Sequence, residues 1–175
     1  MKQILLVHFA FLFSFFVYQD ARAQSSLCAG ADPFCIVNQP GPDATFPAST
    51  GAGVAEPGNK YGCLGSQPNP AWYFVEMASN GAINIQASNS GNFDIDFALW
   101  GPFPSVATAI NTCGSLPAPI DCSYSTAATE FINIPASAQT GQVYIMIITN
   151  FSNQPTTIRV EDIAGTVGTT SCTTT

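Results

Sequence analysis

Two aspartates separated by one residue, Asp94 and Asp96, are the most distinctive polar feature of this sequence. They fall in the alternating run FDIDFALW (93–100), which is typical of a β-strand, so both carboxylates lie on one face about 7 Å apart. Repulsion between them has to be offset. Because Ca²⁺ takes six to eight hard oxygen ligands, Asp94, Asp96 and Asp121 are candidate ligands of a calcium ion. Further candidate ligands are Glu76 and the backbone carbonyls of 89–92. The alternative is an ordinary strand face, solvated or bonded to loop amides.

Chemistry that depends on histidine is excluded from the mature chain. The one histidine, His8, lies in the N-terminal segment 1–23 that we expect to be removed. Without it there is no Ser-His-Asp triad, no Cys-His pair and no imidazole metal ligand. A Ser–Lys dyad would need Lys60, and the surrounding residues 58–62 are typical of a turn. We therefore expect no enzyme, and a glycosidase that uses two carboxylates is the remote alternative.

Aromatic residues form a second group of candidates. Trp72 and Tyr73 are followed directly by Phe74. Because successive side chains of a strand point to opposite faces, at least one of these three rings lies on the other face of the strand from the remaining two. Trp100 leads into a Gly-Pro corner before Phe103. Exposed rings of this kind stack on sugars or anchor a protein partner, and buried ones belong to the core. The candidate ligand or interface residues are Trp72, Tyr73, Trp100 and Phe103.

The charge of the mature chain excludes two classes of partner. Lys60 and Arg159 are its only bases, against ten carboxylates, which gives a net charge of −8. Nucleic-acid binding requires several bases on phosphates, and attraction to anionic lipid requires a basic surface. We expect no nucleic-acid partner, and no membrane insertion after signal cleavage.

The first 23 residues have the pattern of an export signal. Lys2 precedes the apolar run 4–18, and Ala21-Arg22-Ala23 is a small-x-small cleavage site. The run is short for a membrane-spanning helix, which needs roughly 20 residues. The pattern predicts a secreted protein, extracellular or at the cell surface.

All six cysteines lie in the mature part: Cys28, Cys35, Cys63, Cys113, Cys122 and Cys172. An even number in an exported chain indicates three disulfides. The sequence leaves many pairings open, and short loops favour Cys113–Cys122 and Cys28–Cys35. A zinc site is disfavoured because there is neither a C-x-x-C pair nor a histidine.

Short runs of β-branched and aromatic residues, separated by Gly, Pro and Asn turns, predict an all-β domain without helices. The expected strands are 72–77, 82–87, 93–100, 130–134, 142–149 and 156–161. The chain divides into a signal peptide (1–23) and one domain (24–175), with 24–70 mostly loop, an edge strand near Thr45-Phe46, 71–162 the main strands and 163–175 a tail. The spacing predicts an antiparallel, jelly-roll-like β-sandwich stapled by disulfides.

Alternation also predicts which side chains share a face. In 93–100 one face carries Phe93, Ile95, Phe97 and Leu99, and the other carries Asp94, Asp96, Ala98 and Trp100. In 142–149 both faces are apolar, which predicts a central strand whose outer face is also covered.

Four segments together resemble one family: YGCLGSQPNPAWYF (61–74), DIDFALWGPF (94–103), DCSYSTAATE (121–130) and GQVYIMIITNFSNQP (141–155). They resemble the secreted β-sandwich domain of cell-surface proteins of gliding bacteria. More loosely, they are similar to pre-peptidase C-terminal and CUB-like jelly-roll modules. The resemblance implies a non-catalytic module, in some cases with Ca²⁺ bound at the positions of Asp94 and Asp96. Ile132 and Thr156 stand near positions where members of the family often carry a further cysteine pair.

These features predict a secreted, non-enzymatic module for cell-surface adhesion, ligand binding or extracellular assembly. The expected partner is a protein or glycan at the cell surface, or a second copy of the chain. A subunit of an extracellular fibre and a carbohydrate-binding module are the alternatives.

Overall fold

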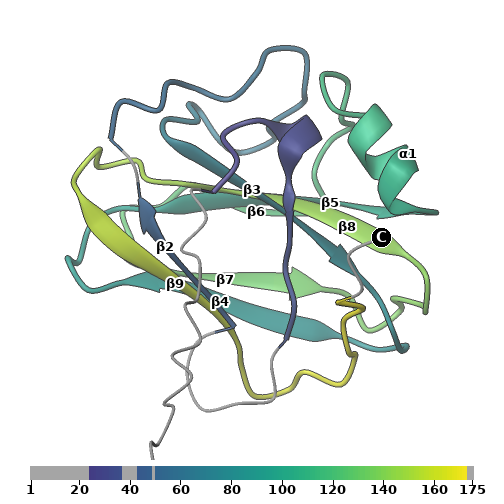
Figure 1. Ribbon diagram of the computed structural model, residues 1–175. Helices are drawn as coiled ribbons and strands as arrows, with labels where there is room; N and C mark the ends of the chain where they lie inside the picture. Colours follow the sequence, from purple (N-terminus) through teal and green to yellow (C-terminus); the bar gives the residue numbers. More distant parts are fainter. Residues whose placement is uncertain (1–23, 37–42, 49, 173–175) are drawn as a thin grey trace, which may run out of the picture.

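Two β-sheets pack face to face in the computed structural model, which describes residues 24–36, 43–48 and 50–172 (Figure 1). The first sheet has the strand order β1 (Asp32–Pro33), β3 (Pro70–Glu76), β8 (Val143–Thr149), β5 (Asp96–Phe103) and β6 (Asp121–Ser123). The second has the order β2 (Ala44–Ala48), β9 (Thr156–Asp162), β4 (Ile83–Asn89) and β7 (Thr129–Ile134). Strand pairs are antiparallel except β1 with β3. The predicted all-β sandwich is confirmed, and the predicted signal peptide (1–23) lies outside the described residues.

The core between the sheets follows from alternation along the strands. In β4, Ile83 and Ile85 are buried, while the intervening Asn84 and Gln86 are partly exposed. Phe97 and Leu99 of β5 belong to the same inner cluster. The predicted inner face of 93–100 is therefore confirmed from Ile95 onward, because a period of two places every second side chain between the sheets.

A second apolar cluster covers the outer face of the first sheet. It joins alternate residues of β8 to the 3₁₀ helix η1 (Cys28–Gly30), the loop before β3 and the helix α1 (Val106–Asn111). Figure 1 shows η1 and α1 on this side of the sheet. All seven residues of β8 are buried between β3 and β5. The prediction of a central strand with a covered outer face is confirmed.

The expectation of a chain without helices is wrong at α1. Ser105 caps this helix, and its hydroxyl oxygen accepts a hydrogen bond from the Thr108 N–H at 3.2 Å. The helix has six residues, fewer than two turns, so its apolar residues cannot repeat often enough to give a helical period. Its buried residue Ala109 packs into the apolar cluster on the outer face of the first sheet.

The disulfides are Cys28–Cys113, Cys35–Cys172 and Cys63–Cys122. The predicted short-loop pairs Cys113–Cys122 and Cys28–Cys35 are wrong, because strand topology and not loop length brings the sulfur atoms together. Cys28 in η1 meets the end of α1, and Cys122 in β6 meets the loop before β3. Each bridge closes a long loop, with sequence separations of 85, 137 and 59 residues.

The segment 163–172, predicted as a tail, is bonded to the sandwich. The Val167 N–H donates to the Ala82 carbonyl and the Ser171 N–H to the Glu76 carbonyl, both at 2.8 Å. The Cys35–Cys172 disulfide then ties its end to the N-terminal part of the domain. Within the described ranges, no helix is both long and apolar enough to cross a membrane.

Candidate functional site

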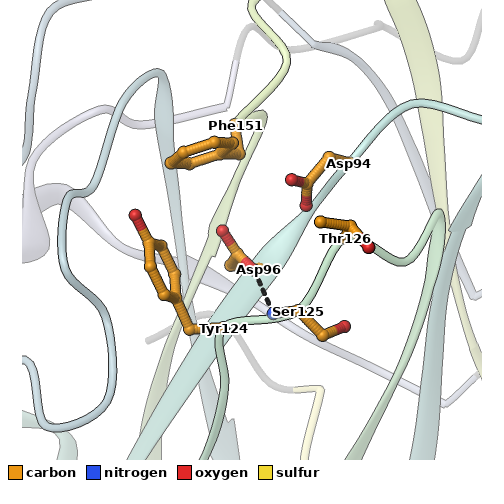
Figure 2. A pocket seen from close by; sticks show the side chains of 6 residues that line it. All are labelled: Asp94, Asp96, Tyr124, Ser125, Thr126 and Phe151. Carbon is orange, nitrogen blue, oxygen red and sulfur yellow. Dashed lines mark hydrogen bonds between the residues drawn. The ribbon is translucent and has the colours of Figure 1, made fainter.

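A pocket of about 180 Å³ opens at the end of the sandwich where β5 begins. Its lining comes from the start of β5, the β6–β7 loop and the β8–β9 loop: Asp94, Asp96, Tyr124, Ser125, Thr126 and Phe151. Figure 2 shows the two carboxylates pointing toward the space beside the two aromatic rings. Typical small-molecule sites measure roughly 300–1,000 Å³. The pocket therefore suits a side chain or an ion better than an extended ligand.

Asp96 forms the buried floor of this pocket and is 1% exposed. It is the first residue of β5 and lies directly opposite Thr149 of β8. The Ser125 N–H donates to Oδ1 of Asp96 at 3.0 Å (Figure 2), whereas Oδ2 has no hydrogen-bond partner among the described residues. Burial, followed by the charge of Asp94, raises the pKa of Asp96 to about 7, against the opposing effect of the Ser125 N–H. Asp96 is thus a carboxylate that lacks a compensating charge.

Asp94 is held beside it by the two neighbouring loops. Its backbone N–H donates to the Ser152 hydroxyl at 2.8 Å, and its carbonyl accepts from the Ser152 N–H at 3.2 Å. On the other side, the Asn89 side chain accepts from the Phe93 N–H at 3.0 Å and so shapes the turn that leads to Asp94. Oδ1 of Asp94 is buried without a partner among the described residues. Burial, then the charge of Glu130, raises the pKa of Asp94 as well.

Glu130 is a third carboxylate at this end of the sandwich, and it did not figure among the predicted site residues. It accepts a hydrogen bond from the Ser125 hydroxyl at 2.7 Å and is buried. In β7 it shares the inward face with Ile132 and Ile134. That alternation was the signal that could have found it, since an acid at an inward position of a strand needs a partner.

Tyr124 and Phe151 form an aromatic rim that sequence reasoning also missed. Their rings meet edge to face, with centroids 5.4 Å apart and planes at 89°. Tyr124 is 44% exposed and Phe151 is 38% exposed. Both lie in loops, where no periodicity marks their direction, so only the fold brings them to the pocket. Exposed aromatic faces beside carboxylates make a surface that attracts cations.

Neither base of the described residues, Lys60 or Arg159, neutralises these carboxylates. Arg159 pairs with Glu161 at 3.8 Å, and that is the single ion pair found in the described ranges. Lys60 lies in the loop on the outer face of the first sheet, where its carbonyl accepts from Trp100 Nε1 at 3.2 Å. The pocket therefore carries uncompensated negative charge.

Two acids predicted as calcium ligands lie elsewhere. Asp121 pairs with Leu99, whose side chain points between the sheets, whereas Asp96 shares the outer face with Ala98 and Trp100. The Asp121 carboxylate instead accepts the Asn133 N–H of β7 at 2.8 Å.

Glu76 is more remote still. It lies opposite Val143 while Asp96 lies opposite Thr149, so six residues of β8, about 20 Å, separate the two acids. No cluster of three or more His, Cys, Asp or Glu suited to a metal occurs in the part of the chain that the structure describes.

The predicted aromatic ligand residues are buried instead of exposed. Trp72 and Trp100 are 0% exposed and stack on the outer face of the first sheet, with centroids 5.6 Å apart and planes at 26°. Trp100 Nε1 donates to the Pro117 carbonyl at 2.9 Å. Tyr73 is buried on the opposite face against Phe34, and Phe103 belongs to the outer cluster. The large apolar area of these rings stabilises the core, so none of them offers a free face to a sugar.

The fold and the pocket define a disulfide-stapled β-sandwich with an acidic, aromatic-rimmed pocket at one end. No family model matches the chain, and no curated protein sequence matches it. One similar solved structure is the pre-peptidase C-terminal domain of a collagenase from Bacillus anthracis, with 11% identity over 81% of this chain and 98% of that chain and a TM-score of 0.46. Another is PliG of Aeromonas hydrophila, a periplasmic inhibitor of g-type lysozyme. The match has 13% identity over 76% of this chain and 96% of that chain, with a TM-score of 0.38. At these values we transfer neither function nor residues from either.

Proposed function

We propose that this protein is a secreted, non-enzymatic binding module that holds its ligand through a positively charged group in the pocket at Asp94 and Asp96. The observation that carries the proposal is Asp96, whose side chain lines an open pocket while its Oδ2, buried from water, has no partner among the described residues. Removing a charged oxygen from water without a partner costs free energy. A cation seated against it recovers that cost, so the pocket favours a cationic group.

The location of the protein supports a partner outside the cell. Three disulfides indicate an oxidising compartment, either the cell envelope or the extracellular space. The mature chain has no histidine and carries a net charge of −8, which favours binding over acid–base catalysis and steers cationic partners toward the domain. Cell-surface adhesion through a protein partner is the role that fits these properties.

Calcium is the second candidate for the cation. Four buried oxygens without hydrogen-bond partners among the described residues lie at this end of the first sheet, on Asp94, Asp96, Thr149 and Asn150. They favour a hard cation, but Ca²⁺ requires six to eight oxygens, which is more than these four, and the Phe151 ring supplies none. A thermal melt with and without EDTA tests this candidate, because Ca²⁺ that binds the folded state alone raises its stability by RT ln(1 + [L]/Kd).

The fibre alternative requires an open strand edge, and both edges of the second sheet are protected. On β7, the Asn133 N–H points to the Asp121 carboxylate instead of to a neighbouring strand. On β2, Pro47 lacks the N–H that a further strand would need. An acid or a proline at such a place is a common defence against edge-to-edge pairing. The second sheet therefore offers no unprotected edge strand for fibre assembly, which supports a binding module.

Binding of the labelled, purified protein to intact cells of its source tests the proposal. We expect saturable binding that Asp96→Asn abolishes and Glu76→Gln preserves, because both variants replace a carboxyl group by an amide but only the first alters the pocket. Equal binding by the wild type and Asp96→Asn would show that the pocket does not hold the ligand.

A further inference from the structure

We propose that the pocket receives the basic side chain, a lysine or an arginine, of a protein partner. The Asp94 and Asp96 carboxylates contact its charged end, while the Tyr124 and Phe151 rings pack on its stem. This inference rests on the proposed function, since it names the cation that the same pocket takes.

The aromatic rim distinguishes an organic cation from a metal ion. Tyr124 and Phe151 are both more than a third exposed and stand edge to face, so part of each ring faces the pocket mouth (Figure 2). Ring faces attract ammonium and guanidinium groups within about 6 Å. They also bury the methylenes of lysine and arginine, whose long stems pack on apolar surface while the charge reaches polar groups. A metal ion has no methylene stem to bury against such a wall.

The floor supplies the acceptors that a basic group needs. Oδ2 of Asp96 and Oδ1 of Asp94 lack partners among the described residues, and both side chains line the same pocket. An ammonium or guanidinium group donates several hydrogen bonds and accepts none, so the two carboxylates are its complement, and the hydroxyls of Tyr124, Ser125 and Thr126 in the same lining can also accept. By contrast, these two carboxylates fall well short of the ligands that Ca²⁺ requires.

The residues around Asp94 and Asp96 add further negative charge and no positive charge. Glu130 lies behind it, linked through the Ser125 hydroxyl, and no lysine or arginine of the described ranges is paired with either aspartate. Burial and the neighbouring acids raise the pKa of Asp96, which reflects the same lack of a counter-charge. A basic side chain entering the pocket provides that counter-charge, and the net charge of −8 carried by residues 24–175 guides it there.

The volume agrees with a single inserted side chain. About 180 Å³ is below the range of sites for whole small molecules, and the opening lies between two loops at one end of the sandwich. One anchoring residue in a pocket, surrounded by a wider contact, is the usual arrangement at protein–protein interfaces. Arginine is among the residues enriched at such anchors.

The experiment is an NMR titration of the purified protein, read at the ring resonances of Tyr124 and Phe151. The probes are N-acetyl-lysine N-methylamide, its arginine counterpart, the uncharged N-acetyl-norleucine N-methylamide, and CaCl₂. We expect saturable shifts from the lysine or the arginine compound and at least about tenfold weaker binding of norleucine. Asp96→Asn is expected to weaken the binding of the basic compounds by about tenfold or more, whereas Glu76→Gln should leave their binding unchanged.

The other outcomes separate the two proposals. Binding of Ca²⁺ with no response to either basic compound would overturn this inference and keep a cation site in the pocket. Equal binding of norleucine would overturn it as well, by showing an apolar pocket. No response to any cation would overturn the proposed function together with the inference. A spectrum of Asp96→Asn that retains the wild-type dispersion shows that its loss of binding does not come from unfolding.

Discussion

Replacing Asp96 by asparagine should stabilise the protein at alkaline pH. The pKa of Asp96 is raised from 3.8 to about 7 by burial and by Asp94. Because the folded-state pKa lies above the unfolded value, the folded protein binds a proton more tightly than the unfolded chain. The stability that this proton provides is present in full below about pH 4 and is lost as the pH rises through about 7.

The size of the effect follows from the two pKa values of Asp96. The folded and unfolded pKa values differ by about three units, and each unit corresponds to about 1.36 kcal/mol, so the free energy of unfolding changes by about 4 kcal/mol. Water reaching the open pocket lowers this figure, so we expect the free energy of unfolding to fall by about 2–4 kcal/mol between about pH 4 and pH 8.5. Asparagine has the shape of the protonated acid and keeps an oxygen for the Ser125 N–H. Asp96→Asn should therefore match the wild type near pH 4 and exceed it by about 2–4 kcal/mol near pH 8.5.

Urea unfolding across this pH range, with disulfides intact and a chelator present, measures the effect. Glu76→Gln is the matched control, since it removes one charge at the opposite end of the first sheet. A smaller slope should persist in Asp96→Asn, because burial and then Asp43 also raise the pKa of Asp162. Parallel pH profiles for the wild type and Asp96→Asn would refute the assignment of Asp96 as an uncompensated buried acid.

Three further outcomes are expected. Trp100→Ala should lower the free energy of unfolding by about 3–5 kcal/mol, measured in urea, because it empties a fully buried site; a loss below about 1 kcal/mol would contradict its core position. Removing both Cys35 and Cys172 should cost about 2–5 kcal/mol, and peptide mapping of the native protein should recover the Cys35–Cys172 pair and neither short-loop pair. Asp121→Ala should expose the edge of β7 and promote self-association in sedimentation experiments; a monomer unchanged at high concentration would show that Asp121 does not protect the edge.

The strands could be predicted from the sequence because their signal is local. Alternation with a period of two identified β4, β5 and β7, and the unbroken apolar run of β8 identified a strand covered on both faces. The inner and outer faces of β5 followed from the same rule. The helix α1 was missed because its six residues are too few to establish a period.

The disulfide pairing and the composition of the pocket could not be predicted, because both depend on contacts between distant segments. Cys35 and Cys172 are 137 residues apart, and nothing local indicates that they meet. Asp121 was placed with Asp96 because both are acids near strands, but its register opposite Leu99 turns it to the other face. Trp72 and Trp100 were candidates for the surface, and only the segments that cover the outer face bury them.

The pocket pair Asp94 and Asp96 was identified correctly as a close pair, because two acids at i and i+2 share a face in any strand. Tyr124 and Phe151 were not identified as site residues from the sequence, since loop residues carry no pattern that predicts the direction of their side chains. Their meeting at 5.4 Å depends on how the β6–β7 and β8–β9 loops fold over the start of β5. The two carboxylates of the proposed site were thus visible in the sequence, and its two aromatic rings were not.

The most direct test of a cation at Asp96 is the titration of its own carboxyl group. The ¹³C shift of the Asp96 side-chain carboxyl, followed against pH, should have a midpoint near the expected value of about 7 without ligand. With saturating N-acetyl-lysine N-methylamide, the pKa of Asp96 should fall by about one unit or more, because a bound cation favours the ionised form. The same midpoint with and without this compound, and likewise with and without its arginine counterpart, would contradict the account.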